Sequence, residues 1–599
     1  MKGSLVLYKE QPAIVISAGE RIEIELAGGK TQKVRHKDVL PLHPGPIKAL
    51  GELTSCEGDL QTAWEMLAGE TTDLSELAEL AFNEFTPTTA WAAWESVADG
   101  LYFEGKPEEI RARTESEVAA ERARREAREQ ERESWEEFKQ RIEAGSIAPG
   151  DKHYLEEVEA LAIGQSKSSR LLKELASAET AENGHALLLR VGHWDVSNNP
   201  YPAREGINME VAKAELPPLP EEERLDLTHL ASFAIDDEGS TDPDDALSLD
   251  GDTLWVHVAD VAALVRPDFA TDLEARSRAS NLYLPEQIVH MLPESATAQL
   301  GLGLNEVSPA LSFRISLSEN AQAKEVEVHR SLVRVQRLTY EEAETRLTQS
   351  PFDELANLAD RSFERRKQNG AVEISLPEVR VQVEDGEVTI TPLPAHKSRS
   401  LVMEAMLIAG EAVAKYAAEN EIPLPFSTQE PPAMEERPSD TAGMFALRRS
   451  LRRSQLRSVP SSNSGLGLEA YVQATSPLRR YLDLVVHQQV RAHLSDEPMI
   501  PAQDLLERVG AAEALASELR RAERNSRQHW TLVHLQQKQE WRGKGIVVGR
   551  RRQQVITLLP EIGMEARIYA NEDLDLNSEV EVALDSVDLP NLLAHFKIL

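Results

Sequence analysis

Hydrophobic and polar positions alternate over the first 45 residues, in short runs separated by turn residues. The runs SLVLYKE, PAIVISA and RIEIELA have the two-residue period of half-buried strands, and a Gly-Gly turn follows them. A small antiparallel β-barrel is the simplest fold for such a series, and we assign it to residues 1–45.

The pattern becomes helical from about residue 46. WEMLAGETTDLSELAELAF places apolar residues three and four positions apart, and 107–143 is so rich in Glu and Arg that it predicts an exposed helix laced by ion pairs. Segment 166–194 could be a helix-turn-helix or winged-helix element that contacts nucleic acid; the alternative is a pair of helices that only pack against each other. We assign 46–213 to this helical, nucleic-acid-binding region.

Proline-rich AELPPLPEEERLDL, residues 214–227, predicts a linker. Strands and helices then mix in 228–538, where LWVHVADVAALV indicates a buried strand and LVMEAMLIAGEAVAKYAAEN a buried helix. Short alternating strands return in 539–599, with the length and spacing of a five-stranded OB-type barrel. The predicted fold class is therefore a multidomain α/β plus β protein, with a large mixed α/β domain flanked by two barrels and a helical region.

Composition narrows the cellular setting. A single cysteine, Cys56, excludes an internal disulfide framework or a cysteine-rich metal site and fits a reducing compartment. No apolar run approaches the roughly 18 residues that a membrane span needs, and Lys9 and Glu10 interrupt the start too soon for a signal peptide. We expect a cytoplasmic protein.

The formal net charge of −36 argues against a general nucleic-acid coat protein. Screening limits the reach of a charge to about 8–10 Å at physiological salt, however, so an acidic chain can still contain a basic channel. Segment 444–494 holds eight arginines, no lysine and only two acids, Glu469 and Asp483. The charge therefore reverses sharply in this part of the chain.

Acidic residues are most concentrated in residues 236–245, DDEGSTDPDD, where six acids follow the apolar strand SFAI. Like charges repel at this density unless a cation lies among them, and Mg²⁺ prefers a few carboxylates together with water and substrate phosphate. A solvated acidic turn and a calcium loop are the alternatives, although no glutamate closes an EF-hand loop here. Pro243 favours a rigid, aimed loop.

This chain resembles the ribonuclease II/R (RNB) family of exoribonucleases, which hydrolyse RNA from the 3′ end and release nucleoside 5′-monophosphates. The order and spacing of five segments match over roughly 300 residues, and the first and last are highly specific. These segments are IDDEGSTDPDDALSL, LWVHVADVAALV, RSRASNLYLPEQIVHMLPES, LVMEAMLIAG and GLEAYVQATSPLRRYLDLVVHQQV.

The resemblance implies a set of site residues. The family's catalytic aspartates fall on Asp236, Asp242, Asp244 and Asp245, which would hold Mg²⁺, with Mn²⁺ as the alternative ion, and leave Asp237 as an extra acid. Arg479 matches the arginine that clamps the scissile phosphate and acts with Asp242 and Asp244, whereas Arg480 is the weaker candidate, with a salt bridge to Asp483 as its alternative. The remaining expected RNA contacts are Tyr283, Tyr340, Glu404, Arg480, Glu523, Arg550, Arg551 and Arg552.

The chain also departs from the family pattern. The N-terminus lacks the aromatic stripes of cold-shock domains, so we expect a different entrance for RNA. Ile374 occupies a position where relatives often place a stacking aromatic, and Met403 precedes Glu404 where they commonly have two acids. For an isolated tyrosine such as Tyr283 or Tyr340, core packing is the alternative to base stacking.

Taken together, these features predict a Mg²⁺-dependent exoribonuclease that hydrolyses single-stranded RNA from the 3′ end. The alternatives are a catalytically inactive RNA-binding regulator with the same fold and an endonuclease, which would need an open groove. The intact aspartate set and Arg479 favour the exoribonuclease. The expected partner is single-stranded RNA; nothing indicates a membrane or an obligate protein partner, so we expect a monomer.

Overall fold

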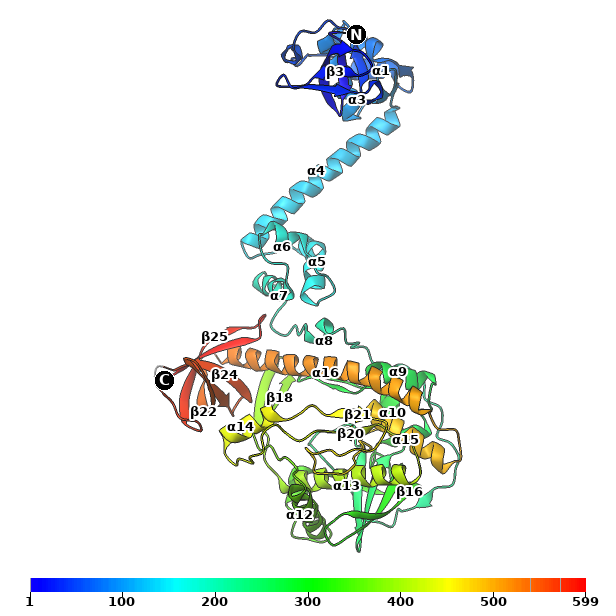
Figure 1. Ribbon diagram of the computed structural model, residues 1–599, viewed down its shortest axis with the longest axis vertical. Coiled ribbons are helices and arrows are strands. Elements are labelled where there is room, and N and C mark those ends of the chain that lie inside the picture. The colour runs from blue at the N-terminus through cyan, green and yellow to red at the C-terminus, as the bar shows by residue number, and fades with distance from the viewer. Residues whose placement is uncertain (1, 539, 571–572) are drawn as a thin grey trace. The chain divides into compact units, whose positions relative to one another are not determined.

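The computed structural model describes residues 2–538, 540–570 and 573–599, and these divide into two compact units between Ala144 and Gly145. The boundary falls inside the region 46–213 that the sequence grouped together. Figure 1 shows the elements of both units.

The first unit begins with a five-stranded antiparallel sheet in the order β4-β3-β2-β1-β5. Alternate residues of its strands, among them Val6, Val15 and Ile24, are buried in one small core. This barrel-like sheet confirms the predicted N-terminal fold. Its strands are β1 (Leu5–Tyr8), β2 (Gln11–Ala18), β3 (Ile22–Glu25), β4 (Thr31–Val34) and β5 (Leu40–His43).

Helices and a second sheet complete the first unit around a core that includes Leu77 and Phe103. Side chains of Asp59, Asp73 and Thr86 cap three of the helices by accepting from backbone N–H groups. The elements are α1 (Leu60–Leu67), β6 (Thr71–Thr72), α2 (Leu74–Phe82), α3 (Pro87–Asp99), β7 (Phe103–Lys106), β8 (Glu109–Ala112) and α4 (Glu115–Glu143).

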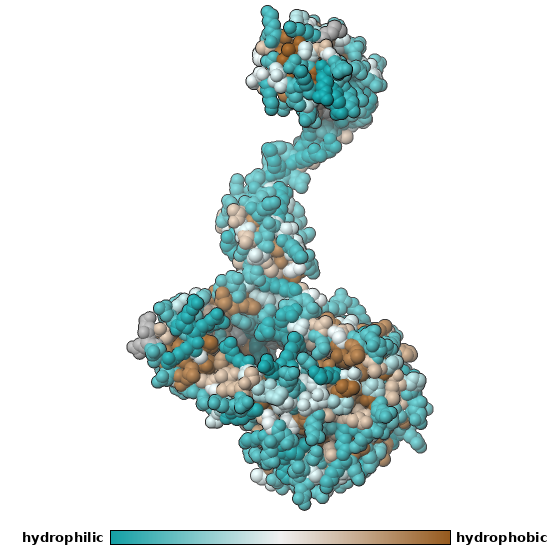
Figure 2. Space-filling view, viewed as in Figure 1, coloured by the Kyte–Doolittle hydropathy of each residue, from teal (hydrophilic) through white to brown (hydrophobic). Residues whose placement is uncertain are grey.

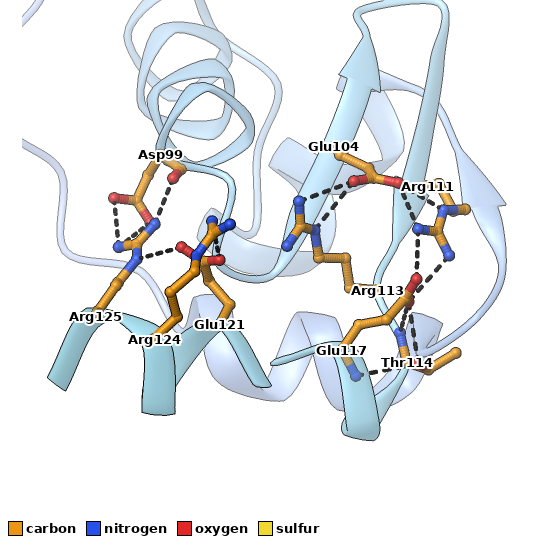
Figure 3. Close-up of polar contacts among 9 residues, drawn as sticks. All are labelled: Asp99, Glu104, Arg111, Arg113, Thr114, Glu117, Glu121, Arg124 and Arg125. Carbon is orange, nitrogen blue, oxygen red and sulfur yellow. Dashed lines mark hydrogen bonds and ion pairs between the residues drawn. The ribbon is translucent and has the colours of Figure 1, made fainter. Parts of the chain in front are cut away.

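Ion pairs hold the first turns of α4 against the rest of its unit (Figure 3). Glu104 of β7 binds Arg111 and Arg113, and Arg111 also binds Glu117 at 2.9 Å. One turn further on, Arg125 bridges Asp99 and Glu121 in a second group of ion pairs. The middle of α4 is hydrophilic on the face seen in Figure 2, as the sequence predicts for an exposed helix.

The second unit begins with short helices: α5 (Lys152–Ala162), α6 (Arg170–Glu174), α7 (Ala181–Arg190) and α8 (Tyr201–Arg204). Gly184 allows α7 to pack closely on α5, because a Cβ there would lie 3.3 Å from the Val158 carbonyl oxygen. Residues 145–224, all of them described, contain no strand. The winged helix is therefore wrong, and a helix-turn-helix and a pair of helices that only pack against each other both fit the observed helices.

A seven-stranded sheet forms the body of the second unit, in the order β17-β10-β11-β12-β15-β16-β9. Phe233 and Leu247 face a core shared with α12 and α13, whereas Ala234 and Ala246 face a second core with α9, α15 and α16. The strands are β9 (Leu225–Asp226), β10 (Ser232–Asp236), β11 (Asp245–Asp250), β12 (Thr253–Ala259), β15 (Ser308–Leu317), β16 (Ala323–Val333) and β17 (Val335–Thr339).

Helices cover both faces of this sheet, and small hairpins lie between them (Figure 1). The helices are α9 (Ala270–Arg278), α10 (Glu294–Leu300), α11 (Tyr340–Glu344), α12 (Phe352–Gln368), α13 (Lys397–Glu419), α14 (Thr441–Ser450), α15 (Tyr481–Leu494) and α16 (Ala502–Gln537). The hairpin strands are β13 (Leu282–Tyr283), β14 (Ile288–Val289), β18 (Val379–Glu384), β19 (Glu387–Pro392), β20 (Phe426–Thr428) and β21 (Gln455–Arg457).

The C-terminal residues form a second five-stranded antiparallel sheet, in the order β24-β23-β22-β25-β26, whose edge strands β24 and β26 also contact each other. This nearly closed barrel confirms the predicted OB-type fold, and α14 packs against its β22. The strands are β22 (Arg542–Arg551), β23 (Gln554–Leu559), β24 (Met564–Tyr569), β25 (Glu579–Asp588) and β26 (Leu593–Ile598). No helix in the described residues is both long and apolar enough to cross a membrane.

The segment predicted as a linker, 214–227, is tied to the large domain by buried charges. Asp260, which is fully buried, accepts from Arg224 and Arg491 at 2.7 Å each, and Arg491 also binds Glu222 at 2.8 Å. The end of this segment is therefore part of the domain's folded core and not a free tether.

Replacing Asp260 with Asn should lower the free energy of unfolding of the large domain by about 3–5 kcal/mol, because two buried guanidinium groups lose the charge that balances them. Urea unfolding curves measure the change. The matched control is Glu327→Gln, which removes a half-exposed partner of Arg314 and should cost less than about 1 kcal/mol. Equal costs for the two variants would contradict a structural role for the buried network.

Candidate active site

The acidic loop is a tight connection between two neighbouring strands. Strand β10 ends at Asp236 and β11 begins at Asp245, and the two strands pair antiparallel. Two contacts hold the turn: Leu302 N–H donates to the Pro243 carbonyl at 2.9 Å, and Arg337 donates to the Ser240 carbonyl at 2.7 Å. The loop thereby gathers the predicted catalytic aspartates at one edge of the sheet.

Asp242 is buried and held by two donors. Its Oδ2 accepts from the Tyr283 hydroxyl at 2.8 Å and from Asn281 Nδ2 at 2.9 Å. The side-chain Oδ1 of Asn281 accepts from Met291 N–H at 2.7 Å, so the orientation of its side-chain amide is fixed. Asn281 is not among the residues predicted from the sequence, although it lies in the family-like segment that contains Tyr283.

Asp244 is the point where the acidic loop meets the arginine segment. Its carboxylate is buried and accepts from Leu478 N–H at 2.7 Å and from Arg479 Nε at 2.9 Å. Arg479 Nη2 in turn donates to the Ser476 hydroxyl at 3.0 Å. These contacts bring Arg479 to the aspartates across more than two hundred residues of chain, as the family resemblance implies.

Burial makes it harder for the aspartates of this loop to be ionised. It raises the pKa of Asp236 and of Asp244, and it raises that of Asp245 to about 7, while the Arg479 charge opposes each rise. For Arg479, burial acts to lower the pKa, but the neighbouring carboxylates outweigh it and the net pKa is raised. The guanidinium therefore stays charged, and the aspartates lie close enough to disfavour one another's ionised form.

The donor chemistry of the loop fits a hard divalent cation, because carboxylate oxygens are its preferred ligands and its charge would relieve this repulsion. No group of three His, Cys, Asp or Glu side chains within the described residues is already arranged around one point. Any ion would therefore draw further ligands from elsewhere, such as water and substrate oxygens.

Tyr283 lies beside the aspartates with 40% of its surface exposed, so it is not an ordinary core tyrosine. Its N–H donates to Glu523 Oε1 of α16 at 3.0 Å, and burial raises the pKa of that glutamate. The structure thus brings Asp242, Tyr283 and Glu523 together from three separate elements.

Two predicted RNA contacts have other partners. Glu404 is buried, binds Arg366 and accepts from the Ser362 hydroxyl at 2.9 Å, so its carboxylate belongs to the core and the expected RNA contact is wrong. Arg480 binds Asp483 at 2.6 Å, which is the salt bridge that the sequence left as its alternative.

Seven of the eight arginines of 444–494 separate into two groups, and the eighth, Arg449, packs on the ring of Phe445. Four are in ion pairs: Arg448 with Glu565, Arg479 with Asp244, Arg480 with Asp483, and Arg491 with Asp260 and Glu222. Three others, Arg452, Arg453 and Arg457, line an open cavity of about 340 Å³ in which Glu430 is the one acid among the lining residues. In the C-terminal barrel, Arg550 binds Asp573 and Asp575.

Known proteins match along most of the chain. The RNB domain matches residues 224–441 and 434–496, the double HTH domain matches 118–200, and the RNase II-type exonuclease C-terminal S1 domain matches 541–598. An uncharacterized ribonuclease from Synechocystis is 32% identical over 595 residues, which cover 91% of this chain and 88% of the relative. The chain belongs to the RNB family of exoribonucleases.

Other RNB-family relatives extend the picture. The chloroplastic/mitochondrial ribonuclease II of Arabidopsis thaliana is 28% identical and covers 72% of this chain and 59% of the relative. The solved structure of the Dss1 exoribonuclease from Candida glabrata covers 100% of this chain and 98% of that one, with a TM-score of 0.66 and 17% identity. Yeast Ssd1, a pseudonuclease, also shares the fold, with a TM-score of 0.52 and 18% identity over 65% of this chain and 59% of that one. Fold alone therefore does not decide catalysis.

Replacing Asn281 with Ala should raise the Mg²⁺ concentration needed for half-maximal RNA hydrolysis by about tenfold or more, because Asp242 loses the amide that orients it. A metal titration of the hydrolysis rate measures this shift. The control is Asn305→Ala, which removes an exposed amide bonded to the Ala298 carbonyl. A metal requirement unchanged by Asn281→Ala would show that this amide does not position Asp242 for metal binding.

Proposed function

We propose that this RNB-family exoribonuclease hydrolyses single-stranded RNA from the 3′ end, releasing one nucleoside 5′-monophosphate at a time, with Mg²⁺ as its metal and Mn²⁺ as the alternative. The single observation that carries the proposal is the contact of Asp244 with Arg479 at the edge where the four aspartates gather. An inactive RNA-binding regulator would be free to lose this set.

Asp236, Asp242, Asp244 and Asp245 would hold the metal, which supplies an activated water and stabilises the leaving 3′ oxygen. Arg479 is anchored at Nε and Nη2 by Asp244 and the Ser476 hydroxyl, and no described residue accepts a hydrogen bond from its Nη1. A planar, permanently charged guanidinium with a free edge is suited to bind an oxygen of the scissile phosphate.

Tyr283 and Tyr340 would pack against the bases at the 3′ end. Stacking on an aromatic ring contributes about 1–3 kcal/mol per base and tolerates any base, so the two rings would set the register of the strand without sequence preference. Glu523, which accepts from the Tyr283 backbone, would fix the first ring beside Asp242.

RNA further from the 3′ end would follow positive charge outside the active site. The cavity lined by Arg452, Arg453 and Arg457 and the exposed basic turn of the C-terminal barrel, with Arg551 and Arg552, are the candidate contacts. The RNase R of Mycoplasma genitalium, which shares the fold at 18% identity and a TM-score of 0.59 over 67% of this chain and 77% of that one, has been solved with single-stranded RNA. This similarity supports RNA as the ligand; cytoplasmic location and a monomeric state remain expectations.

A 5′-labelled single-stranded RNA should shorten as a ladder while nucleoside 5′-monophosphates accumulate, because the active site acts on the last phosphodiester. Gel electrophoresis and chromatography of the products measure this, with and without EDTA. Loss of hydrolysis in EDTA is expected if a divalent metal is required. Internal fragments or 3′-monophosphates would contradict the proposal and favour an endonuclease.

The variant Asp244→Asn separates catalysis from RNA binding in the same assay. It should lower the hydrolysis rate by several orders of magnitude with little change in RNA affinity. A rate within about tenfold of wild type, equivalent to only about 1.4 kcal/mol in the barrier, would show that the metal site is misassigned.

Neutralising the three cavity arginines together, Arg452→Gln with Arg453→Gln and Arg457→Gln, should flatten the salt dependence of binding to long RNA. Each lost phosphate contact lowers the slope by about 0.7. The matched control removes the same charge from three arginines that are already in ion pairs, Arg35, Arg314 and Arg334. Equal salt slopes for the two triple variants would exclude the cavity from the RNA path.

A further inference from the structure

Arg399 packs on the face of Tyr340, one of the two tyrosines expected to contact RNA. Its guanidinium carbon lies 4.1 Å from the centre of the ring, and its Nη2 donates to Asp237 Oδ1 at 2.6 Å. Arg380 of β18 binds the same carboxylate oxygen at 2.7 Å. The start of α13 and strand β18 therefore meet the acidic loop at Asp237, and Arg399 joins that carboxylate to Tyr340.

The backbone of Tyr340 is held as firmly as its ring. Ser398, which precedes Arg399, donates its hydroxyl to the Tyr340 carbonyl at 2.8 Å and its N–H to Glu344 at 2.8 Å. Thr339, the residue before the tyrosine, pairs in register with Asp236. Burial and the nearby Asp236 charge raise the pKa of Tyr340 to about 12, so its hydroxyl beside the acidic loop is neutral.

We propose that Arg399 is a positioning residue that fixes Tyr340 with one ring face covered, so that only the opposite face receives a base of the RNA. A guanidinium packs on an aromatic ring through its flat face and its charge, and the Asp237 carboxylate both orients it and offsets that charge. The inference rests on the proposed function, since it specifies how one part of the substrate site is built.

The proposal also explains the extra acid of the loop. Asp237 differs from its neighbours in the acidic loop because Arg380 and Arg399 both bind its carboxylate, at 2.7 Å and 2.6 Å. Asp237 therefore orients Arg399 on Tyr340, and the other aspartates of the loop would bind the metal.

The competing role for Arg399 is direct contact with an RNA phosphate, since no described residue accepts from its buried Nε. A double-mutant cycle separates the two roles. Wild type, Arg399→Met, Tyr340→Ala and the double variant are compared for binding of a short fluorescent single-stranded RNA in EDTA, where binding is read without hydrolysis. Arg399→Met keeps the apolar stem of the side chain over the ring, and circular dichroism checks that each variant folds.

Each single variant should weaken binding by about tenfold, and the double variant should be no weaker than Tyr340→Ala alone, because Arg399 acts through the ring. Effects that multiply in the double variant would overturn the proposal and assign Arg399 to the phosphate. Full affinity in Arg399→Met would overturn it too.

Two further variants test the part of Asp237. Asp237→Asn should reproduce the loss of affinity seen with Arg399→Met and leave the Mg²⁺ requirement of hydrolysis unchanged, whereas Arg380→Gln should change affinity by less than about twofold. If Asp237→Asn instead needs a higher Mg²⁺ concentration for hydrolysis, Asp237 is a metal ligand. If wild type binds RNA and does not hydrolyse it with Mg²⁺, the proposed function fails while the binding cycle remains readable.

Discussion

The contact between Asp244 and Arg479 is the constraint on which the active site depends. Four aspartates at the end of one strand pair would repel one another, and burial makes that repulsion stronger because water no longer screens it. A guanidinium fixed among them offsets part of the repulsion and keeps its own charge. The bond from Leu478 N–H to the same carboxylate extends this contact to the backbone, so the arginine loop and the acidic loop are joined at two points.

The two loops come into contact because of the layered fold around them. Strands β10 and β11 bury residues on both faces, with large side chains toward α12 and α13 and alanines toward α15 and α16. Residues of α15 share a buried core with these alanines, and the TSPLRR loop directly precedes that helix. The buried ion pairs around Asp260 hold the opposite end of α15 and the segment entering the domain. Packing at both ends of α15 therefore places Arg479 beside the acidic loop.

Neighbouring residues of the same type serve different purposes in this site. Asp236 makes no ion pair among the described residues, whereas Asp237 binds two arginines; Arg479 binds Asp244, whereas Arg480 binds Asp483. Glu404, on the central helix α13, is a core ion-pair partner of Arg366. The partners of Asp237, Arg479 and Glu404 come from elements distant in sequence, whereas Asp483 lies three residues after Arg480. In each case the partner decides whether the charge is available to a substrate.

The sequence alone determined the family, the two barrels and the exposed helix α4, and it predicted the aspartates and Arg479 as site residues, because these depend on local periodicity and on motifs of fixed spacing. It also indicated Tyr283 and Glu523 as neighbours of the site. Only the tertiary structure showed that Asn281 donates to Asp242, that Arg399 packs on Tyr340 and binds Asp237, that Glu404 is buried, and that 214–227 ends in a buried ion network. These facts depend on which charged or polar group lies within about 3 Å of another across the fold, and short-range sequence patterns carry no information about such pairings.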